Sequence, residues 1–249
     1  MSERFPHLSR APITEALLDL RVALPAERGL SEITAAFGAA VAAEYPERSP
    51  IQQLQAQLAF GDSGGGALTS AQHIGDIFWT SDKKRAVQAR LDGFSVNQVG
   101  AYKDWETIVA DAQRHWKAYV AAAKPEKVVR CAARFINRIE VPVGDDLKKH
   151  LLTFPEVGTA LPPLLDEYSF RCILPFDDGR RAAITQATVA SDGGTSSTSR
   201  ALLLDIEAFS DREFAPESAD LWAEFDELRK IKNACFFDSL QPATWKAFL

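Results

Sequence analysis

Arginine occurs at every fourth position in one segment of the chain, at Arg130, Arg134 and Arg138. In an extended strand, residues two apart share a face, so the three guanidinium groups would lie in a row on one side. A guanidinium group binds a carboxylate or phosphate through two parallel hydrogen bonds. The row therefore predicts either a site for an anionic ligand or a set of ion pairs with a neighbouring strand.

Carboxylates suited to both alternatives occur in the segment 201–209. Asp205 and Glu207 share one face there, opposite the apolar residues of the same segment. One interpretation is that these carboxylates simply form ion pairs with the arginines on a solvent-exposed face. Such exposed cross-strand pairs contribute only about a few tenths of a kcal/mol each and imply no function. In an enzyme, the same two carboxylates would bind a metal ion or act as a base beside the arginine-held substrate.

Asn137 lies on the apolar side of the arginine segment, between Phe135 and Ile139. A buried amide without partners costs about 1–3 kcal/mol, so we expect it to form hydrogen bonds. It completes our set of candidate ligand-binding residues, which are Arg130, Arg134, Asn137, Arg138, Asp205 and Glu207.

No catalytic or metal-binding motif accompanies these residues. The histidines His7, His73, His115 and His150 have no partners at metal-ligand spacing, and we expect His115, beside Trp116 on a helix, at the surface. The chain has neither a G-x-x-x-x-G-K-[ST] loop nor a G-x-S-x-G elbow. We therefore expect no metal site and no cofactor, and we favour a binding role over an enzymatic one.

Hydrophobic periodicity predicts the elements that must position these residues. Alternation of apolar and polar residues predicts strands, and apolar residues three or four apart predict helices. The predicted strands cover 11–24, 54–60, 73–80, 86–97, 128–141, 169–176, 181–190 and 201–209. The predicted helices cover 31–45, 104–122 and 218–237, with a short helical piece at 146–152.

Alternation also predicts which residues face the core. In the strand 86–97, Val87, Ala89 and Leu91 share the apolar face. In the strand 128–141, the apolar face begins with Val129.

Consecutive strands favour antiparallel pairing over strict β–α alternation. We therefore predict an α+β protein whose antiparallel sheet carries long helices on one face and charged residues on the other. Residues 1–124 and 125–249 each follow the order β-α-β-β-β-α. Two similar halves, joined in one compact unit, are a hypothesis, because no clear residue identity links them.

Composition and charge narrow the class of protein. The 249 residues carry a formal net charge of −6, which disfavours general nucleic-acid binding. No apolar run is long enough for a membrane helix, and the first residues lack a signal-peptide core. The scattered Cys131, Cys172 and Cys235 are typical of buried free thiols. These features predict a cytoplasmic protein.

Several short motifs follow one another along the chain: HLSRAPITEAL at 7–17, GFSVNQ at 93–98, RFINRI at 134–139, LDI at 204–206 and NACFFDSL at 233–240. With Tyr102 and Trp105, they resemble the landmarks of a sporadically distributed, uncharacterised bacterial protein family of similar length. The resemblance implies no reaction, cofactor or catalytic residue. The patchy distribution of the family implies a link to mobile elements, phage defence or toxin–antitoxin systems.

Three hypotheses for the function follow. The first is a non-enzymatic module that binds a small anionic ligand or a protein partner on the charged face. The second is an enzyme acting on a phosphorylated or nucleotide-like substrate there. The third is an interaction subunit, for example a homodimer, that uses aromatic residues of the last helix, although we favour a core role for these aromatics. They are Trp222, Phe225, Phe236 and Phe237.

Overall fold

The computed structural model describes residues 5–61, 64–155, 158, 160–162, 165, 167–189 and 198–249. Its strands are β1 (Ile13–Ala23), β2 (Glu47–Gly61), β3 (Gly64–Trp79), β4 (Arg85–Arg90), β5 (Gly93–Val99), β6 (Lys127–Pro142), β7 (Ser169–Pro175), β8 (Arg181–Val189) and β9 (Ser199–Ser210). Its helices are α1 (Leu30–Val41), α2 (Trp105–Ala123), α3 (Ala219–Ser239) and α4 (Pro242–Lys246), with a 3₁₀ turn, η1 (Leu147–Lys149).

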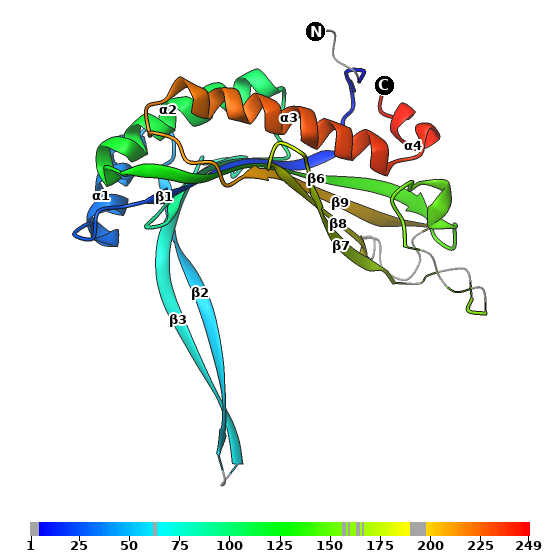
Figure 1. Cartoon of the computed structure of the whole chain (residues 1–249), viewed down its shortest axis with the longest axis horizontal. Coiled ribbons are helices and arrows are strands. Elements are labelled where there is room, and N and C mark those ends of the chain that lie inside the picture. Colours follow the sequence, from blue (N-terminus) through cyan, green and yellow to red (C-terminus); the bar gives the residue numbers. More distant parts are fainter. Residues whose placement is uncertain are drawn as a thin grey trace.

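The strands form one sheet in the order β2-β3-β4-β5-β1-β6-β9-β8-β7, and all neighbours pair antiparallel. The prediction of an α+β protein built on antiparallel sheet is therefore confirmed. Because β1 and β6 are neighbours, the sheet continues across the boundary predicted at residue 124. Figure 1 shows the sheet as an arch, with α1, α2 and α3 along its convex side and the β2–β3 hairpin projecting from one end.

None of the helices in the described part of the chain is long and apolar enough to cross a membrane.

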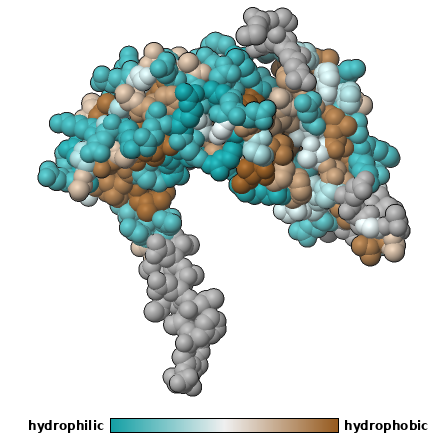
Figure 2. Space-filling view, viewed as in Figure 1, coloured by the Kyte–Doolittle hydropathy of each residue, from teal (hydrophilic) through white to brown (hydrophobic). Residues whose placement is uncertain are grey.

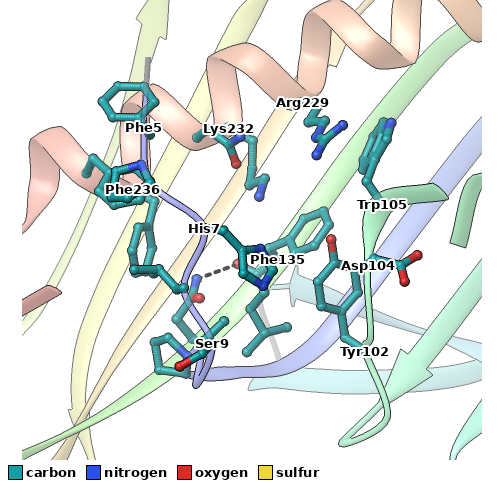
Figure 3. Close-up of a pocket in the computed structure, with 18 of the residues that line it drawn as sticks. Phe5, His7, Ser9, Tyr102, Asp104, Trp105, Phe135, Arg229, Lys232 and Phe236 are labelled. Atoms are coloured by element: carbon teal, nitrogen blue, oxygen red, sulfur yellow. Dashed lines mark hydrogen bonds between the residues drawn. The ribbon is translucent and has the colours of Figure 1, made fainter. Parts of the chain in front are cut away.

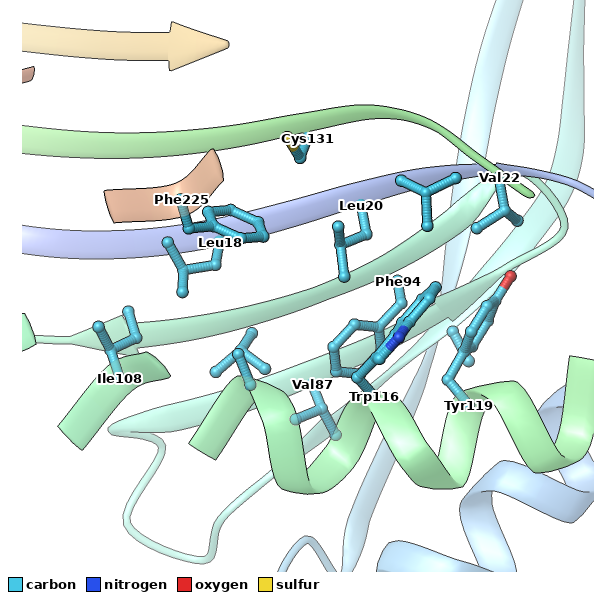
Figure 4. Packing of buried hydrophobic residues seen from close by; sticks show 14 of the residues in the cluster. Leu18, Leu20, Val22, Val87, Phe94, Ile108, Trp116, Tyr119, Cys131 and Phe225 are labelled. Carbon is cyan, nitrogen blue, oxygen red and sulfur yellow. The ribbon is translucent and has the colours of Figure 1, made fainter. Parts of the chain in front are cut away.

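The main core lies between the sheet and the helices α2 and α3. Leu18 and Leu20 of β1 are buried there, as the alternation predicts. Phe94 of β5 packs against Trp116 of α2 at 5.8 Å between ring centroids, and Phe225 of α3 closes the same cluster (Figure 4). Residues of both predicted halves fill this core, so neither half buries it alone.

Side-chain caps define where the two long helices begin. The Asp104 carboxylate accepts a hydrogen bond of 2.7 Å from the backbone N–H of Thr107 at the start of α2. The Ser218 hydroxyl accepts one of 3.1 Å from Asp220 at the start of α3. Each cap satisfies one of the backbone donors that a helix N-terminus leaves without an internal partner.

The prediction of one strand over 86–97 is wrong, because a two-residue turn divides it into β4 and β5. Arg90 pairs with Gly93, and Leu91 and Asp92 lie between them in the turn. Leu91 is therefore exposed and does not belong to the apolar face. Asp92 favours a turn through local hydrogen bonds of its side chain, and Gly93 begins β5 directly after it, so this local signal outweighs the alternation around it.

The expected inward orientation of Val129 is also wrong. Arg21 of β1 pairs with Arg130, whereas the next residue, Val22, pairs with Val128, so Val129 is the extra residue of a β-bulge. Val128 is fully buried in its place. A bulge reverses the alternation on one side of itself, which single-strand periodicity does not reveal.

Helix α1 ends earlier than predicted, at Val41, and β2 and β3 are longer than the predicted strands 54–60 and 73–80. The added strand residues are rich in Gln, Ser and Gly and show no clear apolar alternation. Their pairing rests on backbone hydrogen bonds, which do not depend on side-chain type.

His115 is buried, contrary to the surface position we expected. Its Nδ1 lies 2.9 Å from the backbone oxygen of Asp111, and its ring packs edge-on against Tyr45. Burial lowers the pKa of His115 below 6.5, although the charges of Asp111 and Glu44 act in the opposite direction.

Gly93→Ala should unfold the protein far more readily than an ordinary glycine substitution. A Cβ at this position would lie 2.1 Å from the carbonyl oxygen of Leu20, in the middle of the sheet. We expect a loss of more than about 3 kcal/mol in the free energy of unfolding, measured in urea. Gly158→Ala is the control, because no atom lies within 4 Å of its Cβ, and it should stay within about 1 kcal/mol of wild type.

His115 should make stability depend on pH below about 6.5, the ordinary pKa of histidine. Its pKa is lower in the folded than in the unfolded chain, so the unfolded chain binds more protons there. The contribution is therefore complete above about pH 6.5 and is lost as the pH falls. In His115→Gln the slope of unfolding free energy against pH should be shallower, whereas exposed His7→Gln should keep it. Equal slopes in both variants would contradict this role.

Candidate functional site

The structure separates the six candidate residues into two groups. Five of them lie on the concave side of the sheet, where they form ion pairs. Arg134 donates two hydrogen bonds, of 2.9 and 2.6 Å, to the carboxylate of Asp205, and Arg130 donates one of 2.9 Å to Glu207. Arg138 pairs with Glu140 of its own strand at 3.0 Å. Each of the three arginines therefore has a carboxylate partner on this side.

The ion pairs continue into the first half of the sheet. Asp19 of β1 lies 2.6 Å from Arg90 of β4 and 3.9 Å from Arg130 of β6. The charged side chains therefore form one network from β4 through β1 and β6 to β9, which we call the charged face. Figure 2 shows it as the hollow underside of the arch, with strongly hydrophilic residues at its centre.

This pairing limits what the charged face can do chemically. An incoming anion would have to compete with Asp205 for Arg134 and with Glu207 for Arg130. The same arginines already form hydrogen bonds to Asp205 and Glu207, the two carboxylates proposed as metal ligands or bases. The geometry matches the ion-pair alternative derived from the sequence.

Asn137 is not part of the charged face. Its side chain is buried on the helix side of the sheet, and its Nδ2 donates 3.0 Å to the carbonyl oxygen of Leu204. Within the described residues, no hydrogen bond to its Oδ1 is formed. Asn137 therefore lines a different site, a pocket of about 410 Å³.

The N-terminal segment 5–12 runs across this pocket and forms one wall of it (Figure 3). We call this segment the strap and the cavity the strap pocket. Phe5 stacks on Phe237 with ring centroids 4.6 Å apart. Further along, the backbone N–H of Arg10 donates to Phe248, and its guanidinium group donates to Ala247. The strap is thus fastened at both ends to the C-terminal part of the chain.

Helix α3 forms the opposite wall with one face. Arg229, Lys232, Asn233 and Phe236 follow the spacing i, i+3, i+4, i+7, which places them on one side of a helix. Figure 3 shows Arg229 and Lys232 reaching down from α3 between the strap and the start of α2.

Aromatic rings hold the two cationic groups in place. The Lys232 ammonium lies 4.1 Å above the centroid of the fully buried Phe135 ring. The Arg229 guanidinium lies 5.6 Å from the Trp105 ring centroid, and it donates 3.2 Å to Glu106. Such contacts contribute about 0.5–2 kcal/mol, more where the cation is shielded from water.

Tyr102 adds a neutral hydroxyl group to the same end of the pocket. Burial raises the pKa of Tyr102 to about 12, so the phenol keeps its proton at neutral pH. Its ring meets Phe135 edge-on at 5.2 Å. No hydrogen bond of its hydroxyl is formed within the described part of the chain, so the group can donate to a ligand.

The strap pocket is locally cationic although the chain is acidic. Its described lining residues include four cationic side chains, Arg10, Lys103, Arg229 and Lys232, and two carboxylates. Both carboxylates have structural partners: Asp104 caps α2, and Glu106 pairs with Arg229. This electrostatic balance favours an anionic ligand.

The strap pocket was not predicted as a site from the sequence, although Asn137 belongs to it. The motifs that carry the family resemblance could have indicated this pocket. Residues from four of those landmarks line the pocket: 7–13, Tyr102 with Trp105, Phe135 with Asn137, and 233 with 236–237. These residues are far apart in the sequence, so the sequence alone does not show that they lie close together in the fold.

A second cluster of potential metal ligands lies near the start of β2. Ligand atoms of Glu44, Asp111 and His115 lie within 4.8 Å of one another. Arg114, however, bonds to Glu44 at 2.7 Å and to Asp111 at 2.5 Å, and Arg85 bonds to Glu44 as well. Burial raises the pKa of Glu44, but the two arginines outweigh it and hold the pKa below its ordinary value. The cluster is therefore a neutralised ion-pair network.

No protein-family model matches the chain, and no curated protein matches it.

A buried carboxylate with two arginine partners lies away from both candidate surfaces, between α3 and the β7–β8 turn. Glu224 is almost fully buried and accepts hydrogen bonds of 2.8 Å from Arg180 and 3.0 Å from Arg212. Burial raises the pKa of Glu224, but hydrogen bonds from Arg180 and Ser210 and the nearby positive charges hold it below the ordinary value.

Removing one carboxylate should therefore have very different effects at the two places. Glu224→Gln removes the buried carboxylate that Arg180 and Arg212 share and leaves Arg180 with Asp178 alone, and we expect a loss of about 3 kcal/mol in stability. Asp205→Asn breaks a pair whose arginine is 44% exposed, and we expect less than about 1 kcal/mol. Urea unfolding of both variants measures the difference. Similar losses would mean that the charged face is a structural centre of the fold.

Proposed function

We propose that this protein is a non-enzymatic binding module that holds a small anionic organic molecule in the strap pocket. The observation that carries the proposal is a pair of cationic side chains that line the pocket from one face of α3: Lys232, whose ammonium lies 4.1 Å from the Phe135 ring centroid, and Arg229, one helical turn away. Positive charges gathered in a concave site attract an anion.

The size of the pocket agrees with this function. Small-molecule sites are usually concave and about 300–1,000 Å³ in volume, with polar groups that orient the ligand. The strap pocket has about 410 Å³, with walls that include Phe135 and Phe236. Asn233 and the Tyr102 hydroxyl add polar groups beside the two cations.

Binding is favoured over catalysis at both surfaces. An enzyme acting on a phosphorylated or nucleotide-like substrate would need a free base or a set of metal ligands. Asp205 and Glu207 are held by arginines, and Asp104 and Glu106 of the pocket have the partners described above. A protein partner on the charged face remains part of the proposal as a second kind of ligand.

The family resemblance and the idea of two similar halves also enter as proposals. Residues from four of the resemblance landmarks line one pocket, which is what a ligand site common to such a family would require. Strand order supports a duplication: β1-β5-β4-β3 runs outward on one side of the sheet centre, and β6-β9-β8-β7 runs outward on the other. The two halves differ from the predicted order β-α-β-β-β-α, because β2 has no counterpart in the second half and the 3₁₀ turn η1 stands in the place of α1. In a duplicated protein, β1 would correspond to β6 and α2 to α3.

Lys232→Met should abolish most of the affinity for small acids. It removes the charge but keeps the apolar stem, so the packing on Phe135 survives. We expect wild type to bind benzoate and phenyl phosphate, and the variant to bind them about 10- to 100-fold more weakly, as the loss of a charged hydrogen bond predicts. Isothermal titration calorimetry measures both affinities.

Arg134→Met is the matched control, because it removes the same charge from the opposite face of the sheet. It should bind both acids like wild type. If Arg134→Met weakens binding and Lys232→Met does not, the anion site is the charged face. If neither acid binds wild type at millimolar concentration, the proposed function is wrong.

A further inference from the structure

We infer that two copies of this chain pair through the edge strand β7, so that their sheets join across a two-fold axis at Cys172. This surface is separate from the proposed anion site, because none of the described residues that line the strap pocket belongs to β7. The inference therefore goes beyond the proposed function and does not depend on it.

Strand β7 is the last strand on its side of the sheet, and β8 pairs with one of its two edges (Figure 1). Hydrogen bonds just beyond the two ends of β7 show which backbone groups face β8. At one end, the N–H of Thr188 donates to the carbonyl oxygen of Tyr168. At the other end, the N–H of Phe176 donates to the carbonyl oxygen of Arg180. Opposed residues in an antiparallel ladder alternate between bonded and non-bonded pairs, so the even-numbered residues of β7 bond to β8.

The odd-numbered residues Ser169, Arg171 and Ile173 therefore turn their backbone N–H and C=O groups away from β8. The described part of the chain gives these outward groups no hydrogen-bond partner. Such a row of backbone donors and acceptors at a sheet edge is a template for another strand. Pro175 has no N–H and ends the row. Apolar side chains are exposed on both faces of the same edge, with Ile173 at 46% and Leu174 at 40%.

The residues of β7 are complementary to a second copy of the same strand. In an antiparallel pair centred on Cys172, the outward groups of Arg171 exchange hydrogen bonds with those of Ile173 in the second copy. On the helix side of the sheet, Phe170 lies opposite Leu174, and Cys172 lies opposite its own counterpart. Apolar residues thus meet apolar residues on this side. The pairing also covers the exposed side chains of Ile173 and Leu174.

Other registers of two β7 strands are less favourable. A shift by one residue would set the outward groups against groups that already bond to β8. A shift by two residues in one direction would bring Arg171 opposite itself, with like charges together. The same shift in the other direction would set Arg171 opposite Pro175, which has no N–H to donate. The register centred on Cys172 avoids all three, and its two-fold symmetry closes the assembly at two copies.

The length of β7 sets the strength of the pairing. The strand has 7 residues, and a single strand pair of this length buries less than about 1,200 Å², the size class of weak complexes. We therefore expect a dimer with a dissociation constant on the order of 10 µM.

The test measures molar mass by size-exclusion chromatography with light scattering, at about 2 µM and about 200 µM of chain, below and above the expected dissociation constant. Wild type should be mostly monomer at the lower concentration and mostly dimer at the higher one. Ile173→Lys should weaken the dimer about 10-fold or more, because its ammonium faces Arg171 of the second copy, twice in each dimer. Its fold should survive, since Ile173 is exposed, and urea unfolding at the lower concentration checks this. Leu91→Lys, the same kind of exchange at an exposed leucine in the β4–β5 turn, should dimerise like wild type.

A second measurement locates the two-fold axis. Residues opposite each other in a non-bonded antiparallel pair have Cα atoms about 4.5 Å apart, a separation that a disulfide can span. Diamide oxidises two thiols to a disulfide while it is itself reduced to the hydrazine, so it should join two wild-type chains through Cys172. Cys172→Ser should abolish this cross-link, since Cys131 and Cys235 are buried. Ile173→Lys should keep the thiol and slow the cross-link about 10-fold.

Several outcomes would overturn the inference. Wild type that stays monomeric at about 200 µM has no such interface. A mass above that of a dimer means head-to-tail association of β7 with another edge. If Ile173→Lys dimerises like wild type, or if Cys172→Ser is still cross-linked, the two copies meet at another surface. In each case, the affinity of the strap pocket for anions is measured separately and the proposed function is unaffected.

Discussion

Strand β6 is hydrogen-bonded along both edges, to β1 on one side and to β9 on the other, and this double pairing constrains the rest of the structure. Each of its side chains must point either to the helices or to the concave side. Arg134 points to the charged face, and its neighbour Phe135 forms the base of the strap pocket. A register shift of one residue would exchange them and destroy both surfaces. One backbone thus builds two sites of opposite character.

The two surfaces handle positive charge in different ways. On the charged face, the Arg134 side chain is 44% exposed and donates two hydrogen bonds to the carboxylate of Asp205. Both water and Asp205 therefore stabilise its charge. In the strap pocket, Lys232 is only 9% exposed and lies on an aromatic ring. An aromatic ring attracts a cation through its quadrupole without carrying a charge of its own. The proposed function rests on this ammonium lining the pocket beside Arg229.

The strap pocket also depends on both ends of the described chain. Phe5 packs on Phe237, and Arg10 bonds to the carbonyl oxygens of Ala247 and Phe248. The strap and the C-terminal residues therefore hold each other in position. Segments held by few contacts open at a lower free energy than the central strands do, so these terminal contacts govern how closed the pocket is.

The sequence by itself determined the period-two alternation of β6 from Arg130 onward, the antiparallel α+β class and the opposition of a charged face to an apolar one. These properties depend on which residues are neighbours in the chain, and side-chain direction in a strand follows from that alone. Only the tertiary structure decided that Arg134 meets Asp205, 71 residues away, because that contact depends on the register between β6 and β9.

The turn at Leu91 and the bulge at Val129 escaped prediction for a related reason. Both change the alternation at a single residue, and the pairing partner decides where. His115 became buried because Tyr45, seventy residues earlier in the chain, packs against its ring. The strap pocket was decided by tertiary structure alone, since the strap, the start of α2, β6 and α3 each supply one wall and the folded sheet brings them together.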